Sequence, residues 1–205
     1  MEWISLFIGY ILGSVPSAVW LGQTFHHTDV REYGSKNAGA TNTFRVLGWK
    51  TGIIVLLLDM LKGYGAVLIC ERIFHLPPQN TILVLTGAAA VIGHIFPLFA
   101  EFRGGKGIAT LAGIGVALFP LSFLIILGVF LLVFLSTRYV SLGSITGAVS
   151  LPFVSYFIEQ NQNPQIITFT IIIAIIVPLT HRKNISRLKN GTEKKLKITN
   201  SKHKT

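Results

Sequence analysis

Four short segments of this chain are rich in glycine and in small hydroxyl or amide side chains, and most of them carry a cation. They are Tyr33–Arg45 (YGSKNAGATNTFR), Phe102–Thr110 (FRGGKGIAT), Ser141–Ser144 (SLGS) and His181–Asn184 (HRKN). Backbone N–H groups, hydroxyls and a positive charge together bind phosphate. We therefore predict that the four segments, which belong to different helices, converge on one site for phosphorylated molecules.

The first segment is the most informative. Its small residues Gly34, Gly39 and Ala40 allow close approach of the backbone to a ligand. Other side chains add hydrogen-bonding groups, and an arginine offers a two-pronged donor to phosphate. These residues are Ser35, Asn37, Thr41, Asn42 and Arg45. The alternative is a glycine-rich connector in which Asn42 or Thr43 caps a helix.

The second segment contains Gly104, Gly105, Lys106 and Gly107, directly before a run of small apolar residues. If that run is a helix, the amides of the loop and Lys106 face an anion at the helix N-terminus. The segment is not a P-loop, because the first glycine and the hydroxyl after the lysine are missing. The alternative is that Lys106 only marks the edge of a membrane.

The remaining two segments carry weaker signals. Ser141 and Ser144 are predicted ligands, but serines also cap helices and pack between them. His181 and Asn184 lie three residues apart, so one helical face presents both. The alternative for this last segment is a basic stop after a membrane span.

The composition shows which elements must position these segments. The 205 residues are 51% hydrophobic and 13% charged, with a mean hydropathy of +0.61, which is typical of an all-α membrane protein. Long stretches that are poor in charge alternate with short polar segments. The stretches are Trp3–Thr28, Thr51–Cys70, Ile73–Ala100, Gly107–Thr137, Val140–Ile158 and Gln165–Thr180.

The distribution of basic residues decides how many spans there are. Gly107–Thr137 would make a helix of about 46 Å, too long for one crossing of about 30 Å. A hairpin at Phe119–Pro120 gives seven spans and puts all but two of the 18 Lys and Arg residues on one side. The positive-inside rule then predicts seven transmembrane helices, with the N-terminus outside and the four segments on the cytoplasmic face.

This topology also predicts the domain organisation and the location. Residues 1–190 form a single polytopic domain in the cell (inner or cytoplasmic) membrane, and residues 191–205 form a basic cytoplasmic tail attracted to anionic lipid. Nucleic acid is not an expected partner, because the basic residues flank apolar segments. No metal or other cofactor is expected, since the histidines are scattered and no Cys or carboxylate cluster accompanies them. The oligomeric state is left open, with a monomer among the options.

Two charges lie inside a predicted span. Asp59 and Lys62 are three residues apart and are expected to form a structural ion pair that supports the first loop; a proton relay is the alternative. His94 is expected to be a hydrogen-bonded packing residue, with a general base as the alternative. Cys70 is expected to be a buried thiol.

In these motifs the chain resembles the bacterial acyl-phosphate glycerol-3-phosphate acyltransferases, the PlsY family. The resemblance runs nearly end to end: Ile11–Ser17 (ILGSVPS), Gly34–Asn42 (GSKNAGATN) with Arg45, Asp59-x-x-Lys62-Gly63, Gly93–Pro97 (GHIFP), Phe102–Gly107 (FRGGKG), Ser141-x-Gly-Ser144, His181-Arg-x-Asn184, Arg187-Leu188 and Gly191-x-Glu193. It implies a seven-helix enzyme that uses a long-chain acyl phosphate and sn-glycerol 3-phosphate to make lysophosphatidic acid, by substrate-assisted catalysis.

The resemblance also implies roles for individual residues. Those expected to act on glycerol 3-phosphate are Ser35, Arg45, Lys106, Ser144, His181 and Asn184, with Ser141 as a further substrate-binding residue. Glu193 is expected to be structural. A His-x-x-x-x-Asp pair, which acyl-CoA-dependent acyltransferases carry, is absent from the sequence. The competing hypotheses are an organic-phosphate transporter and a scaffold that binds anionic lipid through its tail.

Overall fold

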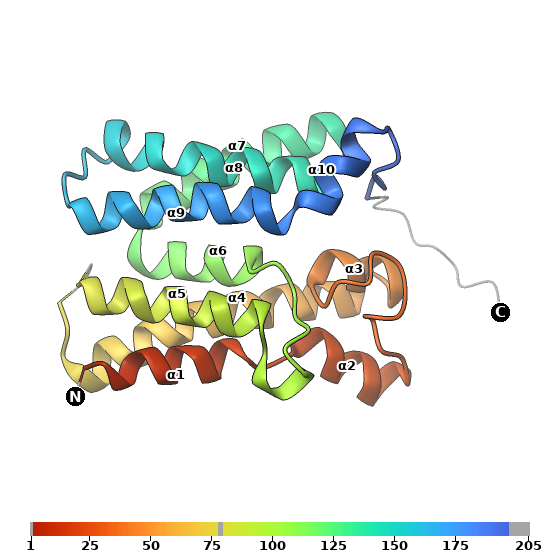
Figure 1. The fold of residues 1–205 in the computed structure, drawn as a ribbon, viewed down its shortest axis with the longest axis horizontal. Coiled ribbons are helices and arrows are strands. Elements are labelled where there is room, and N and C mark those ends of the chain that lie inside the picture. Colours follow the sequence, from red (N-terminus) through yellow and green to blue (C-terminus); the bar gives the residue numbers. More distant parts are fainter. Residues whose placement is uncertain (1, 78–79, 197–205) are drawn as a thin grey trace. The chain divides into compact units, whose positions relative to one another are not determined.

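The computed structural model describes residues 2–77 and 80–196, and within them it contains helices and no strands (Figure 1). It divides into two compact units, one running up to Ala117 (unit 1) and the other covering Leu118–Leu196 (unit 2). Residues 197–205, most of the predicted basic tail, lie outside the described residues.

Unit 1 is built around three neighbouring helical segments. Its elements are α1 (Ile4–Gly13), α2 (Ser17–His26), α3 (Ala40–Val46), α4 (Trp49–Phe74), α5 (Thr81–Ile95), the 3-10 turn η1 (Leu98–Ala100) and α6 (Ile108–Leu118). The helices α1, α4 and α5 all contact one another. Glycines allow the closest approach: a Cβ at Gly13 would overlap the carbonyl of Ala90, and one at Gly93 would overlap that of Tyr10. Small residues at helix interfaces are characteristic of membrane proteins.

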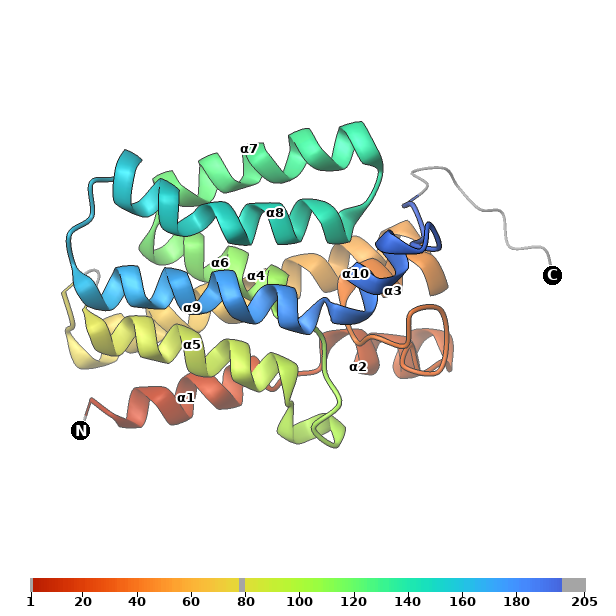
Figure 2. The same ribbon diagram turned by 45° about the horizontal axis from the view of Figure 1, so that its top comes forward.

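In unit 2, α8 packs between two other helices, as Figure 2 shows. The elements are α7 (Pro120–Thr137), α8 (Val140–Phe153), the π-helical turn η2 (Val154–Ile158), α9 (Pro164–Thr180) and α10 (Arg182–Lys189). Pro152 has no N–H to continue the α-helical hydrogen bonds, and the wider turn η2 begins two residues later, at Val154. On its α7 side, α8 presents Gly143, where a Cβ would lie 2.9 Å from the Phe130 ring.

Five helical segments in the described part of the chain are long and apolar enough to cross a membrane, or six if α9 and α10, bent by 60°, form one span. The predicted break at Phe119–Pro120 is confirmed, because α6 ends at Leu118 and α7 begins at Pro120. However, α6 has 11 residues. At 1.5 Å per residue it is about 16 Å long, half of the hydrocarbon thickness. The prediction of seven full spans is therefore not confirmed.

The two intramembrane charges belong to α4 and lie beside a break in the first span. Lys62 Nζ is 2.9 Å from Asp59 Oδ1, so the predicted ion pair is present. Lys62 also donates a hydrogen bond of 3.0 Å to the carbonyl of Val15, in the break between α1 and α2 before Pro16. Backbone groups freed inside a membrane must find a partner. The pair therefore stabilises the break itself, whereas the sequence had suggested the following loop.

Candidate active site

Unit 1 brings the first two glycine-rich segments into direct contact. The turn Gly104–Gly107 precedes α6, and it lies against the end of α5 and against the loop that leads into α3. A Cβ at Gly105 would lie 2.9 Å from the carbonyl oxygen of Ala38. The two predicted cations of this unit, Arg45 on α3 and Lys106 in the turn, therefore belong to segments that pack on each other.

The side chain of Asn42 folds the first segment. This residue is 1% exposed. Its Oδ1 accepts a hydrogen bond of 2.8 Å from the amide of Ser35, and its Nδ2 donates to the carbonyls of Val30 at 2.7 Å and Tyr33 at 3.1 Å. An amide that satisfies three backbone groups fixes the loop, so Asn42 positions the half-buried Ser35 in addition to its predicted place among the substrate-binding residues.

The remaining small residues shape the backbone of the two segments. Gly39 precedes the first turn of α3, which carries Ala40 and Thr41, while Gly34 has a φ of +63° that other residues rarely adopt. In the second segment, the amides of Gly104 and Gly105 donate to the carbonyls of Ile95 and His94, each at 3.1 Å. These two amides therefore cap α5, which differs from the expectation that they face an anion.

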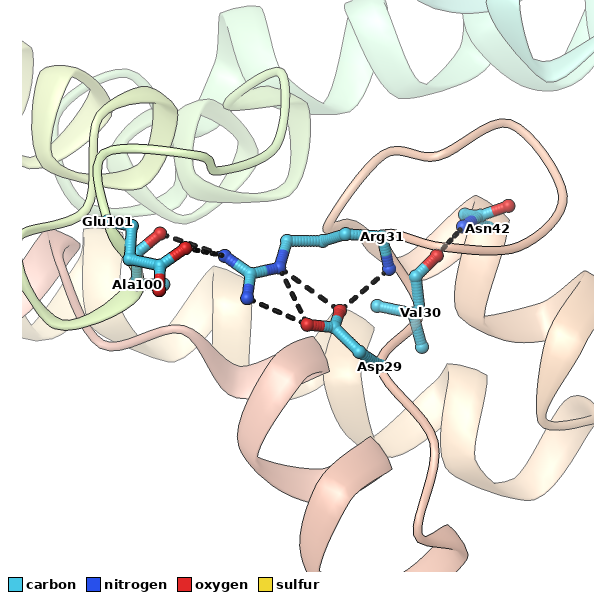
Figure 3. Close-up of polar contacts among 6 residues, drawn as sticks. All are labelled: Asp29, Val30, Arg31, Asn42, Ala100 and Glu101. Carbon is cyan, nitrogen blue, oxygen red and sulfur yellow. Dashed lines mark hydrogen bonds and ion pairs between the residues drawn. The ribbon is translucent and has the colours of Figure 1, made fainter.

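An ion pair between Asp29 and Arg31 was not predicted from the sequence, where Arg31 served only as one of the basic residues that indicate topology. Arg31 Nε lies 3.0 and 3.1 Å from the two Asp29 carboxylate oxygens, and its Nη2 lies 2.7 Å from Oδ2 (Figure 3). The Arg31 hydrogen bonds hold the pKa of Asp29 below its usual range. The Asp-x-Arg spacing beside a span end is the signal that could have revealed the pair.

His94 packs against the turn that carries Lys106. It is 5% exposed, and its Nε2 is so close to Gly105 that a Cβ there would overlap it. Its Nδ1 is 3.7 Å from Asp59 Oδ1. His94 is therefore a buried residue that fills the space between the intramembrane ion pair and the glycine turn.

Unit 2 brings the other two segments together around Glu193. Its Oε1 accepts hydrogen bonds from Ser141 Oγ at 2.7 Å and Asn184 Nδ2 at 2.6 Å, and its Oε2 accepts from Arg187 Nε at 2.7 Å. Glu193 is 8% exposed. One carboxylate thus links the start of α8 to α10, which places Ser141 and Asn184 in one cluster.

The remaining predicted residues of unit 2 are also buried. Ser144 Oγ donates to the carbonyl of Val140 at 2.9 Å, one turn earlier in α8. His181, at the junction of α9 and α10, is 3% exposed, and its Nδ1 lies 2.8 Å from the carbonyl of Val177. Because a carbonyl only accepts, Nδ1 must carry the proton, and this bond fixes the ring orientation.

Replacing Glu193 by glutamine tests the role of this cluster in stability. Burial acts to raise the pKa of Glu193, but the hydrogen bonds from Arg187, Asn184 and Ser141 outweigh it and leave the pKa below its ordinary value of 4.5. Its stabilising contribution is therefore complete above that ordinary value and is lost as the pH falls through the lower folded value.

We expect Glu193→Gln to lower the Tm at neutral pH and to flatten the fall of Tm between about pH 6 and pH 3. Thermal unfolding in detergent measures both effects. Glu32→Gln, at an exposed position, is the matched control and should follow the wild type. A Glu193→Gln profile parallel to that of the wild type across the acid range would contradict the role assigned to the carboxylate.

Among the described residues, no group of three or more His, Cys, Asp or Glu side chains is arranged to hold a metal ion. What each unit provides instead is a set of hydroxyls, amides and cations: Ser35, Arg45 and Lys106 in unit 1, and Ser144, His181 and Asn184 in unit 2. Such groups bind and neutralise phosphate.

Known proteins share both the sequence and the fold. The family model "Glycerol-3-phosphate acyltransferase" matches residues 3–191. Glycerol-3-phosphate acyltransferases from Fusobacterium nucleatum and Listeria monocytogenes are 45% and 46% identical, covering 92% and 93% of this chain and 95% and 94% of their own lengths.

Two crystal structures of PlsY (YgiH), an integral membrane glycerol 3-phosphate acyltransferase, are similar to this chain. The glycerol 3-phosphate form has a TM-score of 0.87 at 36% identity, over 96% of each chain. The lysophosphatidic acid form has a TM-score of 0.83 at 35% identity, over 96% of this chain and 95% of the other. The family model and the full-length relatives show that this chain belongs to the glycerol-3-phosphate acyltransferase (PlsY) family of integral membrane enzymes.

Proposed function

We propose that this protein transfers a long-chain acyl group from an acyl phosphate to the sn-1 hydroxyl of glycerol 3-phosphate, forming lysophosphatidic acid and inorganic phosphate, the first step of bacterial phospholipid synthesis. The observation that carries the proposal is membership of the acyltransferase family over residues 3–191. The solved relatives support the acceptor and the product, because they were crystallised in glycerol 3-phosphate and lysophosphatidic acid forms.

The proposed substrate ligands are the residues predicted from the four polar segments. Arg45 and Lys106 neutralise phosphate charge, and Ser35, Ser144, His181 and Asn184 donate or accept hydrogen bonds at the substrates. Ser141, the side chain of Asn37 and the backbone of Gly34, Gly39–Asn42 and Gly107 complete the proposed binding set. Gly104 and Gly105, whose amides cap α5, border this set and let the turn lie close to it. The packing of Gly105 beside Ala38 supports the part of this set that lies in unit 1.

The proposed chemistry is direct attack on a mixed anhydride. The sn-1 hydroxyl oxygen bonds to the acyl carbonyl carbon, the bond from that carbon to the phosphate oxygen breaks, and the hydroxyl proton passes to a substrate phosphate. Phosphate is already a good leaving group, so positioning and charge stabilisation supply most of the catalysis. The four segments contain no carboxylate, and Asp29, with its lowered pKa, is a weak proton acceptor.

We further propose that residues 1–190 act as one acyltransferase domain in the cytoplasmic membrane, with the N-terminus outside and the site and C-terminus inside. The concentration of Lys and Arg on one predicted side supports this orientation. The acyl chain would then lie among apolar helices while its phosphate reaches the polar segments.

The experiment is a donor comparison with purified protein in detergent or a lipid mesophase. We expect turnover with palmitoyl phosphate, which EDTA leaves unchanged, and none with palmitoyl-CoA. A phosphate donor is favoured because the sequence lacks the His-x-x-x-x-Asp pair. Turnover with the thioester alone would overturn the donor assignment, and activity lost with EDTA and restored by Mg²⁺ would overturn the metal-free chemistry.

A further inference from the structure

We propose that Arg31, oriented by Asp29, is a positioning residue that holds the two glycine-rich segments of unit 1 at the spacing needed to bind glycerol 3-phosphate. The inference rests on the proposed function, because it concerns the same substrate. Neither residue belongs to the four segments predicted to touch substrate.

The guanidinium of Arg31 contacts two different groups, a carboxylate and a backbone carbonyl. Its Nε and Nη2 engage the carboxylate of Asp29, and the Arg31 amide also donates to Asp29 Oδ1 at 2.8 Å. Its Nη1 points the other way and donates to the carbonyl of Ala100 at 2.9 Å (Figure 3). The carboxylate therefore fixes the plane of the guanidinium, and the fixed plane aims Nη1 at a backbone group in another segment.

Arg31 connects the backbone near Val30 to the backbone at Ala100, and both of these places lie near the proposed phosphate ligands in the sequence or through hydrogen bonds. On one side, Val30 is held by Asn42, whose Oδ1 also accepts from the Ser35 amide. On the other side, Ala100 closes the turn η1, and the chain reaches Lys106 six residues later. A shift of Ala100 relative to Val30 therefore changes the distance between the Lys106 turn and the Ser35 loop.

Both partners of the ion pair are largely shielded from water. The side chains of Arg31 and Asp29 are 11% and 16% exposed. Glu101 also lies near Arg31, but its contact is 3.9 Å long and its side chain is 76% exposed. Glu101 thus differs sharply from Asp29 in its distance to Arg31 and in its exposure, and it provides a matched control for Asp29.

The test uses Arg31→Lys, which keeps the charge but cannot reproduce a planar fork and a third, oppositely directed donor. Asp29→Asn is the milder second variant, and Glu101→Gln is the control. We expect the KM for glycerol 3-phosphate to rise about tenfold in Arg31→Lys, a loss of about 1.4 kcal/mol in binding, and by a smaller factor in Asp29→Asn. Glu101→Gln should behave as the wild type.

The KM separates positioning from mere stability, because a smaller folded fraction lowers the apparent kcat and leaves KM unchanged. Hydrogen exchange of the Gly104–Gly107 amides gives a second readout that needs no turnover, and it should be faster in Arg31→Lys than in the wild type. An unchanged KM in both variants, or unchanged exchange in this turn, would overturn the inference. A wild-type protein without acyl transfer would instead refute the proposed function, and exchange would still decide the role of Arg31.

Discussion

Lys106→Ala is expected to lower kcat/KM for glycerol 3-phosphate by a factor of about 10² to 10³, which corresponds to about 3–4 kcal/mol. The proposed reaction brings two phosphate groups together, and removing a nearby cation would leave negative charge without compensation. The loss should appear mainly in the use of glycerol 3-phosphate, and Arg45→Ala should have an effect of the same kind.

Steady-state kinetics with each substrate varied in turn measures these effects. Lys50→Ala is the control, because Lys50 is an exposed lysine at the start of α4 and should retain wild-type kinetics. Lys106→Arg should recover part of the activity, since it restores the charge but not the shape. Near-normal kinetics in both Lys106→Ala and Arg45→Ala would remove the proposed phosphate site.

Gly105→Ala is expected to lower activity at least a hundredfold, because the added methyl group must push two segments apart. A Cβ at this position would overlap His94 Nε2 and would lie 2.9 Å from the carbonyl of Ala38. His94 is buried and cannot swing into solvent. The turn must therefore move, and Lys106, the next residue, moves with it.

Gly65→Ala is the matched control for this substitution. Gly65 lies within α4, and a Cβ there would meet nothing within 4 Å. This variant should keep wild-type activity and have an equal or slightly higher Tm, because alanine favours a helix more than glycine does. Activity of Gly105→Ala within a few fold of the wild type would show that the close packing of the two segments is not needed for the reaction.

Much of the fold follows from composition and length. The charge-poor stretches predict most of the helices, and the break before Pro120 could be predicted because proline cannot continue a helix. The number of full spans was not settled by the sequence, because the distribution of basic residues favoured seven spans although a break at Phe119–Pro120 leaves a short first arm after Gly107. That arm is α6, which has 11 residues and is too short to cross the hydrocarbon.

The internal contacts of the candidate site residues could not be predicted from the sequence. Residue types show that the four segments hold donors, but the same donors also satisfy the chain's own backbone. Asn42 and Ser141 illustrate this, since the first folds its own loop and the second binds Glu193. Asp29 and Arg31 were missed because a charge beside a span usually signals topology, and its partner is visible only in three dimensions.

Membership of the acyltransferase family also bears on the competing hypotheses from the sequence. A transporter of organic phosphates and a lipid-binding scaffold both account for a basic, apolar chain, but neither accounts for a family match over residues 3–191. The enzyme hypothesis accounts for the composition and for the family match, and it gives the hydroxyls and cations of the four segments a reaction to support.

The most direct test of the central claim is the stoichiometry of products from purified protein supplied with palmitoyl phosphate. We expect one phosphate to be released for each lysophosphatidic acid formed, and no release when glycerol 3-phosphate is omitted. Phosphate release without lysophosphatidic acid, or no turnover by protein shown to be folded, would contradict the assignment of this chain as an acyl-phosphate-dependent glycerol-3-phosphate acyltransferase.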